Sequence, residues 1–265
     1  YINLPQIIDE SRENTRTFKY TPKVENYIFA KELTQYCKTN FNLDIHPIIN
    51  VVVPIIPKAK FIDYFKKIYD LGFDTFLLIG KDKSNIQYPG YEVTEASHIL
   101  KDYFNNIKIG GITIFHRENE IKRIINKINH GIEFLVSQII YNTSELEKII
   151  ENLHLYNIKT KIFVSIAPVT NTKEIEFLKW LGVNLNNINF NHDIQNSSIE
   201  MIKNIILNIS EINLSNLKLN KDITLGFNVE HITYNNLELS EKIIKIIKLK
   251  LENLKLLSSK ISNLK

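Results

Sequence analysis

Short runs of β-branched and other apolar residues alternate along the chain with longer segments whose apolar positions recur every three or four residues. The run at 48–54, IINVVVP, precedes a segment with apolar residues at 61, 64, 65, 68 and 71. A buried strand followed by an amphipathic helix is the unit of a parallel sheet with crossover helices. This pair recurs with strands expected at 74–80, 109–115, 132–141 and 160–167, and helices at 94–106, 118–130, 143–156 and 172–182.

Both ends of the chain supply further strands. YINLPQIID and RTFKY precede a helix expected from about Val24 to Thr39, and DITLGFNVEH (222–231) precedes a helix at 238–262, while the Asn-rich stretch 185–209 predicts a loop that turns into helix. The expected strands total eight. The sequence lacks the Gly-rich phosphate-binding motif that is typical of an open doubly wound sheet, which favours a closed barrel. The pattern predicts an α/β fold, a (β/α)8 TIM barrel that forms one domain over residues 1–265.

Composition excludes several classes of protein. With 44% hydrophobic and 23% charged residues the chain is typical of folded domains, and a net charge of +4 from scattered residues argues against nucleic-acid binding. The single Cys37 excludes a disulfide framework. No apolar stretch reaches the roughly 18 residues of a membrane span, and the opening YINLPQIIDESREN does not have the basic region followed by an apolar region that a signal peptide shows. We expect a protein of the cytoplasm or an organellar matrix, neither membrane-bound nor secreted.

The carboxyl ends of barrel strands carry the reactive residues of such folds, so the candidate site can be read from the sequence. His116 and His231 lack companions at metal-ligand spacing, which predicts no metal site. Lys81, Lys83 and Arg117 suit a phosphate or carboxylate ligand, or are simply solvated. The candidates at strand ends are Glu10, Lys81, Tyr88, His116, Arg117, Ser137, Gln138, Tyr141, Asn228, Glu230 and His231.

Two of these candidates allow contrasting interpretations. Gln138 interrupts an otherwise apolar strand, so its amide must bond to backbone, water or a ligand, because an unpaired buried amide costs roughly 1–3 kcal/mol. Glu10, in the string DESR, either serves chemistry at the end of the first strand or pairs with Arg12 or caps a turn.

The sequence resembles the methylenetetrahydrofolate reductase family, and in particular its divergent bacterial branch. The similarity extends over nearly the whole chain and rests on the order and spacing of several strings rather than on one motif. They are IIDESR (7–12), YPGYEVTEASHIL (88–100), GGITIFHRENE (110–120), KINHGIEFLVSQIIYN (127–142), SIAPVTNTKEIEFLKWLGV (165–183) and LGFNVEHIT (225–233).

The resemblance implies reduction of 5,10-methylenetetrahydrofolate to 5-methyltetrahydrofolate, with NADH or NADPH as hydride source. A carboxylic acid must protonate the ring nitrogen, and the resemblance assigns this to Glu10, with Glu230 in reserve. Gln138 takes the place of the family's pterin-binding glutamine. The resemblance further implies substrate contacts from Ser137, Tyr141, Asn228 and His231, and cofactor contacts from Lys81, Tyr88, His116 and Arg117.

Departures from the family pattern bear on the cofactor. The flavoprotein members begin with Glu-x-x-Pro-Pro, where this chain has Ile2 and Gln6 around Pro5, and they carry Arg-Gly-Asp where it has Ile79, Gly80 and Lys81. Loss of the aspartate beside the flavin predicts weak or absent FAD binding, although Lys81 could equally stabilise an anionic reduced flavin. Alternatively, the barrel has lost its catalytic activity and acts as a folate-binding or structural partner subunit. In either case it could form a homo-oligomer or associate with another chain.

Overall fold

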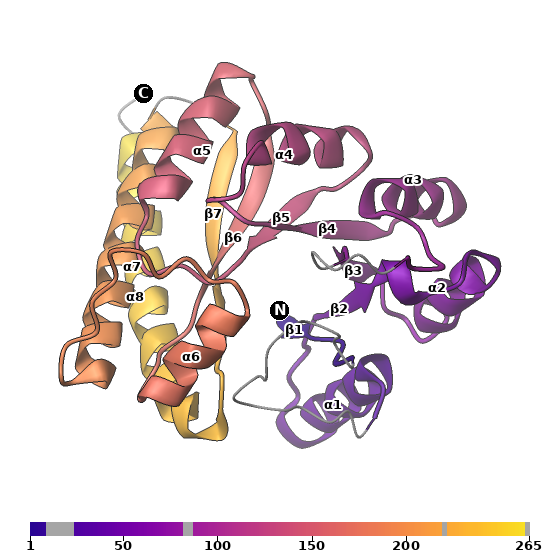
Figure 1. Cartoon of the computed structure of the whole chain (residues 1–265), viewed down its shortest axis with the longest axis horizontal. Coiled ribbons are helices and arrows are strands. Elements are labelled where there is room, and N and C mark those ends of the chain that lie inside the picture. The colour runs from indigo at the N-terminus through magenta and orange to yellow at the C-terminus, as the bar shows by residue number, and fades with distance from the viewer. Residues whose placement is uncertain (9–23, 82–86, 219–221, 263–265) are drawn as a thin grey trace. The chain divides into compact units, whose positions relative to one another are not determined.

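The computed structural model describes residues 1–8, 24–81, 87–218 and 222–262, with side chains as far as 252. Strands and helices alternate along the chain, except that α6 is followed directly by α7 (Figure 1). The strands are β1 (Ile2–Leu4), β2 (Pro47–Val52), β3 (Thr75–Ile79), β4 (Lys108–Thr113), β5 (Phe134–Ser137), β6 (Thr160–Ile166) and β7 (Ile223–Val229). The α-helices are α1 (Asn26–Phe41), α2 (Phe61–Tyr69), α3 (Val93–Tyr103), α4 (Glu120–Asn129), α5 (Ser144–Leu155), α6 (Thr172–Trp180), α7 (Ile194–Lys218) and α8 (Leu237–Ser262).

The seven described strands form one sheet in chain order, and the pairs β1–β2, β2–β3, β3–β4 and β6–β7 are parallel. The predicted α/β class and parallel arrangement are therefore confirmed. The strand expected at RTFKY lies outside the described residues, so the closed eight-stranded barrel stays a prediction. The helix expected within the Asn-rich stretch begins at Ile194 and continues to Lys218.

The chain divides into two compact units, which we describe separately. Among the described residues the first unit comprises 1–8, 24–112 and 122–135, and the second comprises 113–121 and residues from 136 onward. The first unit is built around fully buried aromatic rings of helix α2 and strand β3. The ring centroids of Phe61 and Phe65 lie 4.9 Å apart, and those of Phe65 and Phe76 lie 5.1 Å apart.

Gly90 holds two loops of the first unit together. Its N–H donates to Pro54 O at 2.8 Å, at the short 3-10 helix η1 (Val53–Ile55) that follows β2. A Cβ on residue 90 would lie 2.4 Å from Val53 O and 2.6 Å from Ile56 O. Because these are backbone atoms that cannot turn away, glycine is required for this close approach.

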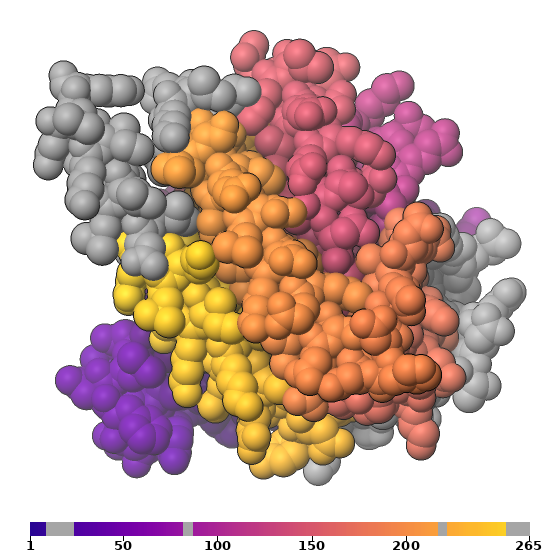
Figure 2. Space-filling model, turned by 90° about the vertical axis from the view of Figure 1, so that its left-hand side faces the viewer, coloured from indigo at the N-terminus to yellow at the C-terminus, as the bar shows by residue number. Residues whose placement is uncertain are grey.

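The second unit places two long helices against each other. Helices α7 and α8 pack side by side and form much of the surface seen in Figure 2. Ile202, Ile205, Ile206 and Ile209 of α7 are buried at the spacing of one helix face. No helix in the part of the chain that the structure describes is long and apolar enough to cross a membrane.

Candidate functional site

Polar side chains at the ends of β5, β6 and β7 form a continuous hydrogen-bonded row in the second unit. Ser165 of β6 lies opposite Asn228 of β7 in the parallel register, so both side chains leave the same face of the sheet. Asn228 Nδ2 donates to Ser165 Oγ at 2.9 Å, and Ser165 N donates to Ser137 Oγ at 2.9 Å. The sequence predicted Ser137 and Asn228 as site residues, and the structure brings them together through Ser165.

Glu230 lies at one end of this polar row. Its Oε1 accepts a hydrogen bond from Asn228 Nδ2 at 2.9 Å, while the residue as a whole is half-buried. Burial of the carboxyl group raises the pKa of Glu230 above its ordinary value, and a hydrogen bond with Ser165 opposes that shift more weakly. The carboxyl group therefore keeps its proton to a higher pH than an ordinary glutamate, as a general acid must.

Gln138 lies at the other end of the row, directly after Ser137. Its Nε2 donates to Leu181 O at the end of α6, at 3.0 Å, and its backbone N donates to Thr113 O at 2.9 Å. The side-chain oxygen Oε1 is buried and has no hydrogen-bond partner among the residues that the structure describes. Such an oxygen is destabilising by about 1–3 kcal/mol until a donor reaches it. Gln138 thus offers a fixed acceptor to a bound N–H group.

Tyr141 is buried beneath the same strand ends. Its hydroxyl donates to Ala167 O at 2.7 Å, and its ring packs edge-on against Phe190 with centroids 5.2 Å apart. Burial raises the pKa of Tyr141, and the charges of Glu174 and Glu230 raise it further. The phenol therefore remains protonated and bonded to the loop after β6.

Glu174, in the first turn of α6, connects the loops that follow β6 and β7. It is fully buried, and its Oε2 accepts from Thr170 N at 2.7 Å and from Asn236 Nδ2 at 3.0 Å. Its Oε1 accepts from Thr233 Oγ1 at 2.8 Å. Because Thr233 follows Glu230 by three residues, these bonds fix the loop that carries the candidate acid.

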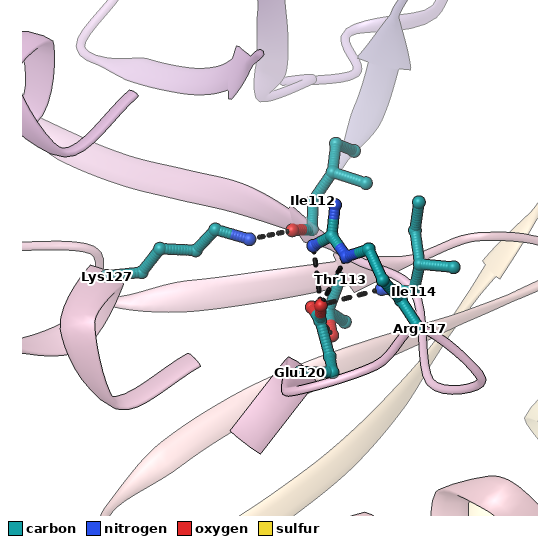
Figure 3. Close-up of polar contacts among 6 residues, drawn as sticks. All are labelled: Ile112, Thr113, Ile114, Arg117, Glu120 and Lys127. Carbon is teal, nitrogen blue, oxygen red and sulfur yellow. Dashed lines mark hydrogen bonds and ion pairs between the residues drawn. The ribbon is translucent and has the colours of Figure 1, made fainter. Parts of the chain in front are cut away.

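Arg117 lies in a second buried carboxylate cluster, which Figure 3 shows in detail. The carboxylate of Glu120 accepts from Arg117 Nε at 2.7 Å, from Thr113 Oγ1 at 2.8 Å and from Ile114 N at 3.2 Å. Lys127, drawn in the same view, donates to Ile112 O. The guanidinium thus stabilises the loop after β4, on which His116 is exposed.

The remaining predicted residues are placed as follows. Lys81 is exposed and its ammonium group lies 3.0 Å from Glu92 Oε1. Tyr88 is half-buried, and His231 is exposed directly after Glu230. Glu10 lies outside the described residues, so its proposed role is not tested.

Sequence reasoning missed Ser165 and Glu174 of this site, and it also missed Asn50, a buried polar residue of β2 in the first unit. Asn50 interrupts the apolar run IINVVV of β2, and this is the same signal that singled out Gln138. Ser165 and Glu174 offered no such signal, since a serine in a strand and a glutamate in the first turn of a helix are common.

A groove of about 610 Å³ lies elsewhere, at the amino ends of the strands in the first unit. Its lining includes Lys38, His46, Asp74 and Lys108, and none of the residues that the sequence predicted for the site. Parallel α/β folds place their sites at the carboxyl ends of strands, so we assign the site to the polar row. Among the described residues no group of three or more His, Cys, Asp or Glu is placed to hold a metal ion.

Comparison with known proteins relates the chain to one family. The family model described as methylenetetrahydrofolate reductase matches residues 115–248, which is half of the chain. A solved structure from Clostridium thermocellum, described as an uncharacterized protein that binds two copies of 5-methyl-5,6,7,8-tetrahydrofolic acid, is similar in fold. Its TM-score is 0.63 at 24% identity, over 82% of this chain and 78% of that one. No curated protein matches the sequence.

Proposed function

Because the chain belongs to the methylenetetrahydrofolate reductase family, we propose that it reduces 5,10-methylenetetrahydrofolate to 5-methyltetrahydrofolate with a reduced nicotinamide dinucleotide. The observation that carries this proposal is the hydrogen-bonded row that ends in the acid Glu230 and the open acceptor of Gln138. The folate bound by the Clostridium thermocellum protein, which has a similar fold, supports a folate substrate.

The reaction needs a proton and a hydride. Protonation of N10 of the folate breaks its bond to the bridging methylene carbon and leaves a cation at N5, which hydride from the nicotinamide converts into the methyl group. Glu230, whose burial raises the pKa of its carboxyl group and so favours the protonated form, supplies the proton. The carboxylate that remains lies in a partly buried site and stabilises the cation.

The hydrogen bonds around Glu230 hold the acid in one position. Asn228 donates to the carboxyl and also to Ser165, so the three side chains restrict one another. Glu174 fixes the loop that begins just beyond Glu230. This arrangement avoids reorganisation when charge develops on the folate.

Gln138 binds the pterin ring in this proposal. A pterin edge carries N–H donors beside a carbonyl, and Gln138 Oε1 is a buried acceptor to which no described residue donates. Its Nε2 is held by Leu181 O, which fixes the direction of the oxygen.

Replacing Gln138 by Ala should weaken folate binding by about 1–3 kcal/mol, because the pterin donor then loses its acceptor. Binding can be followed through fluorescence of the only tryptophan, Trp180, which is adjacent to Leu181. Gln195→Ala, at an exposed position of α7, is the matched control. Equal folate affinity in Gln138→Ala and the control would show that Gln138 is structural.

We further propose that the reductase works without bound flavin. Lys81 stands where flavoprotein members have an aspartate, and in the structure it pairs with Glu92. The protein purified without added cofactor should be colourless, and turnover should persist without added FAD. Absorbance spectra of the purified protein test this, and stoichiometric FAD in the preparation would contradict it.

A further inference from the structure

Two amide side chains lie on the sheet face of the first unit that is turned away from helix α2. Phe76 of β3 packs against Phe65 of α2, which marks the helix-facing side. Ile49 of β2 is in register with Phe76 and faces the same way, so Asn50 faces the opposite way. Asn3 of β1 pairs with the residue two positions before Asn50 and therefore shares its face.

Both amides have an oxygen that makes no hydrogen bond within the described part of the chain. The Oδ1 atoms of Asn3 and Asn50 are buried and have no partner among residues 1–8, 24–81, 87–218 and 222–262, and Asn50 as a whole is only 6% exposed. By contrast, nearby Gln6 accepts from Val52 N at 2.7 Å and donates to Tyr64 Oη at 3.3 Å. Buried polar groups in proteins are nearly always bonded, so two such oxygens on one face indicate a ligand.

The backbone around Asn50 is held firmly. Asn26, the first residue of α1, donates through Nδ2 to Leu4 O at 3.0 Å and to Asn50 O at 2.9 Å. These two bonds join the end of β1 to β2. These bonds hold the backbone of Asn50, and so the starting point of its side chain, in one position. Binding sites in proteins are built on such fixed backbone, which favours a binding role for the Asn50 amide.

The chemistry of this face selects the ligand. Its other described positions on β2 and β3 include Ile48, Val52 and Leu77, which carry no charge. Strand geometry puts the Cα atoms of Asn3 and Asn50 about 8 Å apart, so one small group can reach both oxygens. Two acceptors require two hydrogen-bond donors on an uncharged group, and the NH2 of a primary carboxamide supplies two.

We propose that Asn3 and Asn50 bind the carboxamide of the nicotinamide ring. This assignment rests on the proposed function, which supplies a reduced nicotinamide dinucleotide as hydride source. The two hydrogens of the carboxamide nitrogen satisfy the two Oδ1 atoms, and the ring lies against the apolar side chains of the same face.

Asn50→Leu in the full chain separates a ligand-binding role from a structural one. The variant should bind NADH at least about tenfold more weakly, since one acceptor is lost. It should also melt a few degrees higher, because an apolar side chain of similar size replaces an unpaired buried amide. The matched control is Asn216→Leu, since Asn216 is equally buried but donates to Ile223 O at 3.0 Å, and this variant should melt lower.

A second probe identifies the group that is bound. Reduced 3-acetylpyridine adenine dinucleotide keeps the carbonyl but lacks the carboxamide nitrogen, so the wild-type protein should prefer NADH over it. Asn50→Leu, which keeps only the acceptor of Asn3, should show a clearly smaller preference for NADH. An Asn50→Leu protein that melts lower, or that keeps the full wild-type preference, would overturn the assignment. Folate binding, measured on the same proteins, tests the proposed function separately. A wild-type protein that prefers NADH but binds no folate would refute the proposed function and leave the nicotinamide site standing.

Discussion

Replacing Glu230 by Gln is expected to lower turnover by about 10²- to 10⁴-fold, the usual effect of removing a general acid. The amide keeps the shape of the side chain and still accepts the hydrogen bond from Asn228 Nδ2. Folate affinity should therefore change little, and the loss should appear in kcat. Single-turnover formation of 5-methyltetrahydrofolate measures this effect.

Two further variants sharpen this experiment. Glu238→Gln, at an exposed position of α8, should retain full turnover. Glu10→Gln tests the other acid that the sequence suggested. If Glu10→Gln loses turnover while Glu230→Gln keeps it, the assignment of the proton donor to Glu230 is wrong.

The raised pKa of Glu230 also fixes the direction of the pH dependence. Turnover requires the protonated carboxyl and should fall as pH rises through the pKa in the folded protein. Because this pKa lies above the ordinary value of the unfolded chain, the contribution of Glu230 to stability is complete below that ordinary value. It is lost as pH rises through the folded pKa. Glu230→Gln should not show this loss of stability. In alkaline buffer it should therefore unfold at a higher denaturant concentration than the wild-type protein.

Replacing Glu174 by Ala is expected to reduce the free energy of unfolding by about 3–5 kcal/mol. The substitution leaves Thr170 N and Asn236 Nδ2 without an acceptor in a buried position, and it also leaves a cavity at the start of α6. Urea unfolding of the variant measures the change. The variant should also lose the hydrogen bonds through which Glu174 joins the loop after β6 to the loop after β7.

The control for this change lies two residues away on the same helix. Glu176 is exposed, so Glu176→Ala should unfold within about 0.5 kcal/mol of the wild-type protein. If Glu174→Ala were as stable as Glu176→Ala, the buried carboxylate would not hold these loops together.

Much of the fold could be predicted because buried parallel strands and amphipathic helices have different periods. IINVVVP and TKIFVSIA became β2 and β6, and the helix expected at 143–156 became α5. The Asn-rich stretch was harder to interpret, since no residue in it clearly marks where the loop ends and the apolar face of α7 begins. Element ends shifted by a few residues, because caps and loop contacts depend on neighbours that a sequence pattern does not contain.

The candidate site could be predicted where a polar residue interrupts an apolar strand or follows it directly. Gln138, Asn228 and Glu230 were found in this way. Through Ser165 the structure links Asn228 and Glu230 to Ser137, the residue before Gln138. That link depends on strand register, which the sequence does not specify. The sequence also could not predict the hydrogen bond from Arg117 to Glu120, since that bond depends on the conformation of the loop after β4.

The central claim is that hydride passes from the nicotinamide to the folate on this chain without a flavin. The most direct measurement uses NADH that carries deuterium at the transferred position, with 5,10-methylenetetrahydrofolate and no added flavin. Mass spectrometry should then find one deuterium in the methyl group of 5-methyltetrahydrofolate, undiluted by solvent hydrogen. Product without deuterium would indicate a carrier that exchanges with solvent, and absence of product from protein that binds folate would contradict the proposed reductase activity.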